Sequence, residues 1–321
     1  MRARAPAPPG DPIGRWPQVS HPYGRAWRPI QLRYAVVMRF TKMHGCGNDY
    51  VYVDAWDEDL PDDVAGLARR ISDRHTGVGA DGLIIVGPAS GADMRMTMYN
   101  ADGSQSEMCG NGIRCAAKLA YDHKRVRSST IACATGAGRL EVELLFGSRK
   151  DVIGASVMMG KPRLTPEQVP VIHPGPGPKL RLRLAIDKQP YQLWAVGMGN
   201  PHAVIFVDDP ETFPVAKVGS ALERHAKFPR RTNVEFVARL PDEAGLPVLR
   251  QRTWERGAGE TQACGTGACA VTVAAILAGV IPGREATVRL NGGDLRVAWP
   301  RDDAAVRMTG PAVTVFAGVW K

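Results

Sequence analysis

One tetrapeptide pattern occurs once in each half of the chain, and it constrains the architecture more than any other feature. Cysteine, glycine, a polar residue and glycine follow one another at Cys109-Gly110-Asn111-Gly112 and again at Cys264-Gly265-Thr266-Gly267. Each tetrad leads into a segment of helical character. The two tetrad cysteines are 155 residues apart. A local arrangement repeated at about half the length of the chain predicts two similar halves that face each other. Two matched thiols can then lie on opposite sides of one carbon atom.

The periodicity of the apolar residues predicts a chain richer in strands than in helices. Short apolar or alternating runs are typical of strands, and the alanine-rich stretch after the second tetrad is typical of a helix. We expect strands at residues 50–53, 83–86, 94–99, 192–196, 203–207 and 248–254, and helices at residues 64–74, 113–123 and 268–278. The predicted fold class is therefore α+β, with two pseudo-symmetric domains built from strands, a glycine-rich turn and a helix.

The charge of the chain does not indicate nucleic-acid binding. Of the 321 residues, 44% are hydrophobic and 23% are charged, as in ordinary soluble proteins. The formal net charge is +9, but residues 1–37 hold six arginines and one aspartate and so contribute +5 of it. The rest of the chain is only mildly basic. No stretch approaches the roughly 20 apolar residues of a membrane helix, so we expect neither nucleic acid nor a membrane as a partner.

Residues 1–37 form an extension for which three interpretations stay open. They contain seven of the 25 prolines and show no periodicity, which is typical of a disordered tail. They are rich in arginine and poor in acidic residues, as organelle-targeting peptides are, but serine is scarce. The third interpretation is a start codon assigned too early, with Met38 as the true first residue.

The six cysteines do not form the pattern of a disulfide scaffold or of a zinc site. They are few and irregularly spaced for disulfides, so we expect reduced thiols and a cytoplasmic protein. Zinc ligands usually come as two Cys-x2-4-Cys or His-x3-5-His pairs, whereas here only Cys264 and Cys269 have such a spacing and no second pair accompanies them. We interpret four of the cysteines as structural: Cys46, Cys115, Cys133 and Cys269.

A cysteine at the start of a helix can act as a base. Unpaired backbone N–H groups and the positive end of the helix dipole favour the thiolate and can lower the thiol pKa from about 8.5 towards neutrality. The glycines of each tetrad let a substrate approach the backbone, and the free amides with Asn111 and Thr266 can bind a carboxylate. For a single cysteine, burial as a small apolar residue is the better interpretation. The duplication favours a catalytic pair.

One glycine-rich run resembles the fingerprint of a dinucleotide site. Gly77-Val78-Gly79-Ala80-Asp81-Gly82 matches G-x-G-x-x-G. That fingerprint needs a strand before it and a helix after it, whereas this run follows a helical pattern and precedes a strand. We therefore expect no nucleotide cofactor there.

Six motifs in order closely resemble those of the diaminopimelate epimerase family, and the resemblance spans Met38 to Lys321. The motifs are residues 43–50 (MHGCGNDY), 100–104 (NADGS), 109–115 (CGNGIRC), 199–202 (GNPH), 255–261 (ERGAGET) and 263–268 (ACGTGA). The resemblance implies two similar domains, each a mostly antiparallel sheet around a central helix, with the active site in the cleft. It implies domains at residues 38–156 plus 307–321 and at residues 157–306.

The resemblance also implies the reaction. Members convert L,L-2,6-diaminopimelate to the meso form, in lysine biosynthesis and peptidoglycan supply, without pyridoxal phosphate, metal or nicotinamide. We therefore expect a small-molecule substrate, diaminopimelate, no cofactor and a cytoplasmic homodimer. One thiolate takes the α-proton while the opposite thiol protonates the other face, so the pair titrates as a unit.

The resemblance assigns roles to individual residues. Cys109 and Cys264 match the catalytic cysteines, and His202 matches a supporting polar residue. The substrate-binding positions are Asn48, Asn100, Gly110, Asn111, Asn200, Asn233, Glu255, Arg256, Gly265 and Thr266. Some members carry glutamine where this chain has Gly82, so that contact does not transfer.

Two alternative functions stay open at the level of the sequence. Proline racemases are related but typically carry His where Asn111 stands and Asp in place of the Glu255 context. A thiol switch, in which Cys109 and Cys264 form a reversible disulfide, belongs to a different class. Restoration of enzymatic activity by a reductant separates the switch from the epimerase.

Overall fold

The computed structural model describes residues 37–173, 175 and 180–321. Of the predicted N-terminal extension, residues 1–36 lie outside the described residues. The first half of the described chain contains two helices and eight strands before the connection at residue 159. They are β1 (Met38–Gly45), β2 (Asn48–Asp54), α1 (Val64–Ser72), β3 (Gly82–Gly87), β4 (Met94–Asn100), β5 (Gln105–Ser106), α2 (Gly110–Asp122), β6 (Thr130–Thr135), β7 (Gly138–Phe146) and β8 (Val152–Met158).

The second half repeats this order of elements. It consists of β9 (Arg181–Ile186), β10 (Gln189–Gly197), β11 (Pro201–Phe206), α3 (Val215–Glu223), β12 (Asn233–Glu243), β13 (Leu246–Glu255), β14 (Gly259–Thr261), α4 (Gly265–Ala278), β15 (Glu285–Leu290), β16 (Gly293–Ala298), β17 (Arg307–Pro311) and β18 (Val313–Trp320).

The strand pairing shows the internal repeat directly. In the first half β1 and β2 are antiparallel, β2 and β3 parallel, β3 and β4 antiparallel, and β4 and β6 parallel. In the second half β10, β11, β12, β13 and β15 pair in the same sequence of directions. β18 flanks β1, as β9 flanks β10. The elements of one half therefore have a counterpart in the other, with α2 equivalent to α4.

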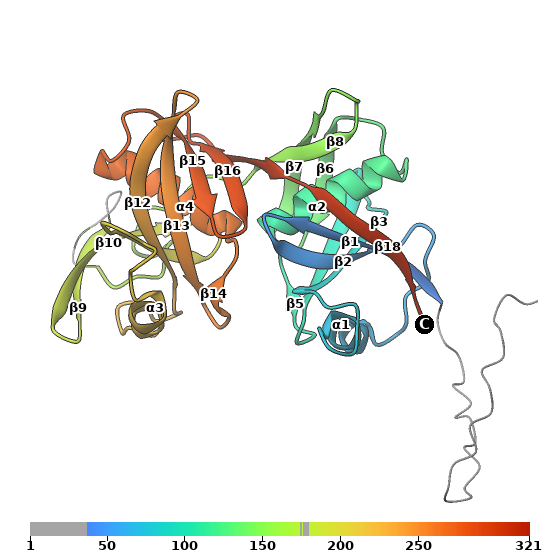
Figure 1. Ribbon diagram of the computed structural model, residues 1–321, viewed down its shortest axis with the longest axis horizontal. Coiled ribbons are helices and arrows are strands. Elements are labelled where there is room, and N and C mark those ends of the chain that lie inside the picture. Colours follow the sequence, from blue (N-terminus) through green and yellow to red (C-terminus); the bar gives the residue numbers. More distant parts are fainter. Residues whose placement is uncertain (1–36, 174, 176–179) are drawn as a thin grey trace, which may run out of the picture. The chain divides into compact units, whose positions relative to one another are not determined.

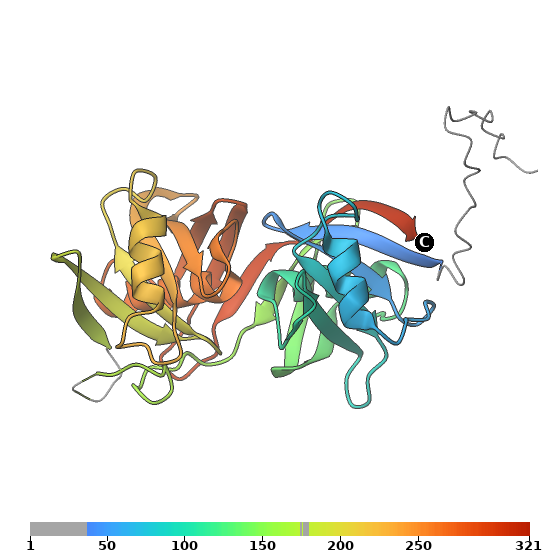
Figure 2. The ribbon, with the colours of Figure 1, turned by 90° about the horizontal axis from the view of Figure 1, so that it is seen from below.

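A central helix is surrounded by strands in each half (Figures 1 and 2). α2 contacts β1, β2, β7 and β8, and α4 contacts β10, β11, β12, β15 and β16. α4 is built almost entirely of alanine, valine and other small residues, and its first ten residues are nearly all buried. A helix without a polar face has to lie inside the fold, so the sheet wraps around it.

The two halves are joined by a ladder between equivalent strands. β8 pairs antiparallel with β17, and β17 pairs on its other side with β16. The chain then crosses as β18 to pair with β1 (Figure 1). The domain boundaries expected from the resemblance stay a prediction.

The structure confirms each predicted strand and helix, with different ends. The helices predicted from residues 113 and 268 begin earlier, at Gly110 and Gly265, directly after the cysteines. Their first turns contain the glycines, which lower helix propensity and so conceal the start. The sequence pattern does not predict α3, which begins after Pro214 without a side-chain cap in the described structure.

Candidate active site

Both tetrad cysteines occupy the N-cap of a central helix. Cys109 precedes α2 and Cys264 precedes α4, each with an extended backbone. The Sγ of Cys109 accepts a hydrogen bond from the backbone N–H of Gly112 at 3.3 Å. The Sγ of Cys264 lies 3.5 Å from the Oγ1 of Thr266. The predicted start of a helix at each cysteine is confirmed.

The expectation that the helix N-termini lower the pKa of these thiols is wrong. Burial raises the pKa of Cys109, and the N–H of Gly112 offsets only part of this rise. The pKa of Cys264 is raised well above its ordinary value, first by burial and then by the carboxyl groups of Glu255 and Glu235. Removing a thiolate from water costs more than the helix amides return. Both thiols therefore favour the protonated form in the structure.

Asn48 connects the first cysteine to its surroundings. Its Oδ1 accepts from the Cys109 thiol at 3.3 Å and from the Nδ2 of Asn111 at 3.3 Å. Its own Nδ2 donates to Asp81 at 2.7 Å, and Asp81 is held by Arg74 at 2.9 Å. The amide of Asn48 is thus fixed with its oxygen towards the cysteine.

Glu255 and its neighbours surround the second cysteine. Burial raises the pKa of Glu255, while hydrogen bonds from Thr261 and Cys264 oppose the rise. The Thr261 hydroxyl donates to Glu255 at 2.6 Å. Asn233 accepts the backbone N–H of Arg256 at 2.8 Å, which fixes the strand end that carries both charged residues.

The two helix N-termini meet at the junction of the halves. The Nδ2 of Asn111 donates to the carbonyl of Ala263, the residue before the second cysteine, at 3.3 Å. A Cβ placed on Gly110 would lie 2.9 Å from the Cε of Met308, and one on Gly265 would lie 3.0 Å from its Sδ. Glycine at both positions lets the helices close on Met308, so the fold brings both tetrads together.

The remaining predicted residues lie at the edge of this cluster or outside its hydrogen bonds. Asn100 ends β4 and donates to the hydroxyl of Ser104 at 2.9 Å. The exposed side chain of Arg256 donates to the carbonyl of Arg230 at 3.0 Å. At Gly82 a side chain would collide with the carbonyl oxygen of Tyr99. Glutamine therefore has no room at Gly82 in this arrangement.

Glu235 is not among the predicted site residues, although it is fully buried and hydrogen bonded to His202 at 2.7 Å. It lies two residues beyond Asn233 on β12, and alternate residues of a strand share a face. The two-residue spacing between Asn233 and Glu235 was the sequence signal that could have identified Glu235.

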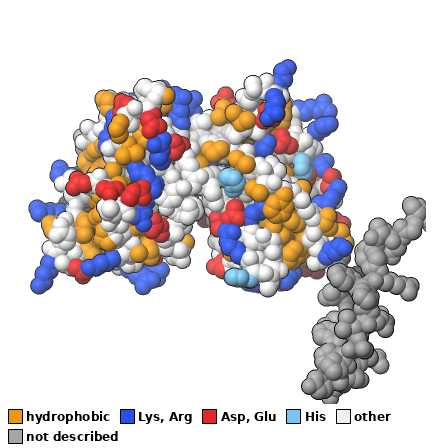
Figure 3. Space-filling view, in the orientation of Figure 1, with side chains coloured by type: hydrophobic (Ala, Val, Ile, Leu, Met, Phe, Trp, Pro, Cys, Tyr) orange, Lys and Arg blue, Asp and Glu red, His pale blue; other side chains and the backbone are white. Residues whose placement is uncertain are grey.

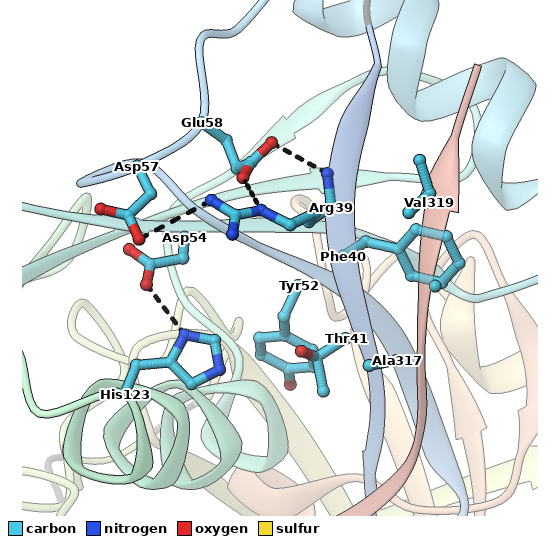
Figure 4. A pocket seen from close by; sticks show the side chains of 11 residues that line it. Arg39, Phe40, Thr41, Tyr52, Asp54, Asp57, Glu58, His123, Ala317 and Val319 are labelled. Carbon is cyan, nitrogen blue, oxygen red and sulfur yellow. Dashed lines mark hydrogen bonds and ion pairs between the residues drawn. The ribbon is translucent and has the colours of Figure 1, made fainter. Parts of the chain in front are cut away.

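A cavity of about 430 Å³ lies elsewhere, beside β1 and β18 (Figure 4). Arg39 reaches Glu58 at 2.5 Å at its rim, and Asp54 pairs with His123 at 2.8 Å. Within the described residues its lining includes none of the predicted site residues. It does not belong to the cysteine cluster.

Three further observations concern the described part of the chain. All six cysteines there are free thiols. No cluster of three or more His, Cys, Asp or Glu side chains among those residues could hold a metal ion. None of the helices described is long and apolar enough to cross a membrane.

The chain matches one protein family over most of its length. A family model described as diaminopimelate epimerase matches residues 40–165 and 194–315. Proteins named diaminopimelate epimerase from Methanococcus maripaludis (strain C6) and Desulfovibrio desulfuricans are 47% and 48% identical to it. Each alignment covers 88% of this chain, and it covers 99% and 98% of those relatives respectively. A protein of the same name from Bacillus mycoides is 46% identical, over 88% of this chain and 96% of the relative.

Solved structures share the fold. A phenazine biosynthesis protein of the PhzF family from Bacillus anthracis has a TM-score of 0.65 at 13% identity, covering 89% of this chain and 99% of that chain. A hydroxyproline epimerase from Agrobacterium vitis has a TM-score of 0.63 at 16% identity, covering 90% and 94%. Such low identity establishes the fold alone. The predicted pseudo-symmetric α+β architecture is confirmed.

Proposed function

The chain belongs to the diaminopimelate epimerase family, and on that premise we propose that it inverts one α-carbon of L,L-2,6-diaminopimelate by a two-cysteine proton transfer, yielding the meso isomer for lysine biosynthesis. The protein is an isomerase, an amino-acid epimerase. One observation carries the proposed mechanism. Two equivalent cysteines cap two equivalent helices whose first turns meet around Met308.

The proposed reaction balances when one of the two cysteines is a thiolate and the other is a thiol. One cysteine in the thiolate form takes the α-proton and becomes a thiol, while the opposite thiol gives its proton to the other face and becomes a thiolate. The electron pair left on carbon is stabilised by the N–H groups of both helix N-termini. No pyridoxal phosphate is needed to balance these steps.

Burial raises the pKa of both thiols, and the same burial makes the thiolate a stronger base once it has formed. A thiolate with a high pKa is a stronger base towards carbon than one with a low pKa, once the substrate has excluded water. In the proposal, Asn48, Asn100, Asn200, Asn233 and Arg256 bind the amino and carboxylate groups. Gly110, Asn111, Gly265 and Thr266 supply N–H and side-chain donors at the helix starts, and Glu255 with His202 flanks the cysteines.

The experiment is turnover of stereochemically defined diaminopimelate in deuterium oxide, followed by NMR and chiral chromatography. The purified protein should interconvert the L,L and meso isomers and incorporate one solvent deuterium at the inverted α-carbon. We expect Cys109→Ser and Cys264→Ser each to lower kcat by at least about 10³-fold, because a hydroxyl is a far weaker acid than a thiol.

The same assay separates the alternatives. Proline and hydroxyproline serve as competing substrates, and deuterium incorporation into either one without incorporation into diaminopimelate would contradict the proposed substrate. Near-normal turnover by either serine variant would contradict the two-base mechanism. Cys133→Ser is the control for general effects of thiol removal, because Cys133 lies on β6 and belongs to neither tetrad.

We also propose that two copies of the chain associate through β18. Among the described residues β18 pairs on one side only, with β1. Its exposed residues include Val313, Val315, Phe316 and Val319, whereas the equivalent edge strand β9 exposes Arg181 and Arg183. Hydrophobic side chains gather over this region in Figure 3. An exposed apolar edge strand favours association, and charged residues oppose it.

A reducing compartment fits the free thiols, on two of which the proposed reaction depends. We therefore place the enzyme in the cytoplasm as part of the same proposal.

A further inference from the structure

Three polar side chains of β2 lie on one face of that strand, because alternate residues of a strand point to the same side: Asn48, Tyr50 and Tyr52. The first of them reaches Cys109, whose Sγ lies 3.3 Å from the Oδ1 of Asn48. The last reaches the first turn of α2, where the hydroxyl of Tyr52 donates to the carbonyl of Gly112 at 3.2 Å. The ring of Tyr50 therefore lies between these two contacts, towards the start of α2.

The residue opposite Tyr50 in β3 is a glycine. Tyr50 pairs with Gly82, and a Cβ built on Gly82 would lie 3.0 Å from the Cε1 of Tyr50. The tyrosine ring thus takes up room that a side chain at position 82 would need. Some members of the family carry glutamine at this position. In this chain, the strand partner of that position supplies a hydroxyl instead.

The Tyr50 hydroxyl is a buried donor beside the Cys109 sulfur. Tyr50 is 5% exposed, and its hydroxyl has Cys109 and Asn48 as hydrogen-bonding neighbours. Burial, followed by the negative charge of an ionised Cys109, raises the pKa of Tyr50 well above its ordinary value. The phenol therefore stays neutral when Cys109 ionises. Because a thiolate carries no hydrogen, the hydroxyl is the donor in that contact.

Hydrogen bonds to the Cys109 sulfur oppose the effect of burial. Burial raises the pKa of this thiol, whereas bonds from the backbone N–H of Gly112, the hydroxyl of Tyr50 and the backbone N–H of Asn111 lower it. The N–H of Gly112 donates to Sγ at 3.3 Å. Of these three donors, Tyr50 is the one that belongs to a side chain. A substitution can therefore remove it without touching the helix start.

The other ionisable groups around this contact do not favour a charge on Cys109. Glu255, at the end of β13 in the other half, raises the pKa of the thiol. Asp81, directly before β3, adds to the effect of burial in raising the pKa of Tyr50. Burial raises the pKa of Tyr52 well above its ordinary value, so that this phenol stays neutral. None of the three replaces the donor that Tyr50 supplies.

The second half carries a different ring at the equivalent position. His202 pairs with Asn233 between β11 and β12, as Tyr50 pairs with Gly82 between β2 and β3. His202 is therefore the counterpart of Tyr50 in the internal repeat.

The residues beneath the two helix starts differ as well. A Cβ on Gly112 would lie 2.6 Å from the Cδ1 of Ile84, and a Cβ on Gly267 would lie 2.8 Å from the Oε1 of Glu235. The same oxygen of Glu235 lies 2.7 Å from the Nδ1 of His202. The counterpart ring is thus engaged by a carboxyl group. A ring hydroxyl directed at the cysteine is a feature of the first half.

We propose that Tyr50 is a catalytic residue: its hydroxyl donates a hydrogen bond to the Cys109 thiolate and thereby directs the single negative charge of the cysteine pair to Cys109. The role of Cys109 as a reacting group rests on the proposed epimerase function. The bond forms when Cys109 is the base and weakens when its sulfur has taken the α-proton. The phenol keeps its hydrogen throughout, so the balance of protons in the proposed reaction is unchanged.

The first experiment measures the ionisation of Cys109 without any substrate. In Cys264→Ser protein the remaining tetrad cysteine titrates alone, and mass spectrometry of its peptide follows alkylation by iodoacetamide as the pH is raised. Tyr50→Phe in this background removes one oxygen atom and adds no donor. We expect the midpoint of the alkylation rate to rise by about one pH unit, since one hydrogen bond to a charged group is lost.

Tyr191→Phe in the same Cys264→Ser background is the matched control. Tyr191 lies on β10 in the other half, where its ring packs against Phe213 with 6.1 Å between the ring centroids. Its substitution should leave the alkylation midpoint of Cys109 unchanged. An equal rise in both variants would overturn the proposal, because the effect would not depend on the hydroxyl beside Cys109.

The second experiment follows turnover of diaminopimelate by Tyr50→Phe with both cysteines present. At neutral pH kcat/KM should fall about ten-fold, because a smaller fraction of the enzyme carries the thiolate. The loss should shrink as the pH rises past the shifted ionisation. A merely structural role of Tyr50 would lower kcat/KM by the same factor at every pH, and that result would contradict the proposal.

An unchanged alkylation midpoint in Tyr50→Phe would also overturn it. Failure of the proposed function would look different. The midpoint would still move in the alkylation experiment, while the wild-type protein would not turn over diaminopimelate.

Discussion

Burial determines the protonation of the cysteine side chains more than local sequence does. It raises the pKa of Cys115 to about 11 and that of Cys133 and Cys269 to about 12. In the unfolded chain these thiols ionise near about 8.5. Their raised pKa values stabilise the folded state below about pH 8.5, and this stabilisation is lost as the pH rises towards their folded pKa values.

The first prediction concerns Cys269. Between pH 8 and pH 10 the unfolded thiol ionises and the buried one does not, so each such cysteine lowers the free energy of unfolding by about 2 kcal/mol over this interval. Cys269→Ala removes one of these groups. We expect its free energy of unfolding to fall by about 2 kcal/mol less than that of the wild type, measured by urea unfolding at both pH values.

Thr130→Ala is the control, because Thr130 is exposed at the start of β6 and threonine does not titrate in this range. It should lose as much stability as the wild type between the two pH values. An equal loss in Cys269→Ala would show that this thiol ionises inside the folded protein.

The pairing of β8 with β17 requires glycine at position 154. Gly154 of β8 pairs with Pro311 of β17, next to Gly310. A Cβ at Gly154 would collide with the carbonyl oxygen of Gly310. Because that oxygen belongs to the backbone, the strands have to separate to admit a methyl group.

The second prediction is that Gly154→Ala destabilises the protein by about 1–3 kcal/mol, as overpacking at a rigid site does. Chemical unfolding measures the change. Gly283→Ala is the matched control, since no described atom lies within 4 Å of its added Cβ, and its stability should stay within about 0.5 kcal/mol of the wild type. Equal stabilities of the two variants would show that the ladder adapts freely.

At the scale of the whole molecule, the exposed apolar residues of β18 predict that two copies of the chain associate. Phe316 is 46% exposed on this strand. We expect the wild type to sediment as a dimer at micromolar concentration and Phe316→Glu to sediment as a monomer, because a buried unpaired carboxylate opposes association.

Ile172→Glu supplies the control for that experiment. Ile172 is 53% exposed and precedes β9 in the other half. The variant should stay dimeric. A wild-type monomer, or a Phe316→Glu dimer of unchanged stability, would contradict association through β18.

Much of the local structure could be predicted because its causes are local. Apolar periodicity predicted six of the 18 described strands and the central helices, and the glycine-flanked cysteines marked the helix starts to within three residues. The partners of Asn48 and Asn111 could not be predicted, since Asp81 and Ala263 are distant in sequence. α3 was not predicted, because no capping side chain marks its start.

The sequence by itself determined that the chain has two similar halves, each with a cysteine at the start of a helix, because repeats and caps are written in neighbouring residues. Only the tertiary structure decided the pKa of each of these thiols and the side chains that surround it. Burial raised both thiol pKa values against the effect of the helix ends, and β12 placed Glu235 where the first half has Ile84. Desolvation and charge act through space, so their balance depends on which distant strands lie beneath each helix.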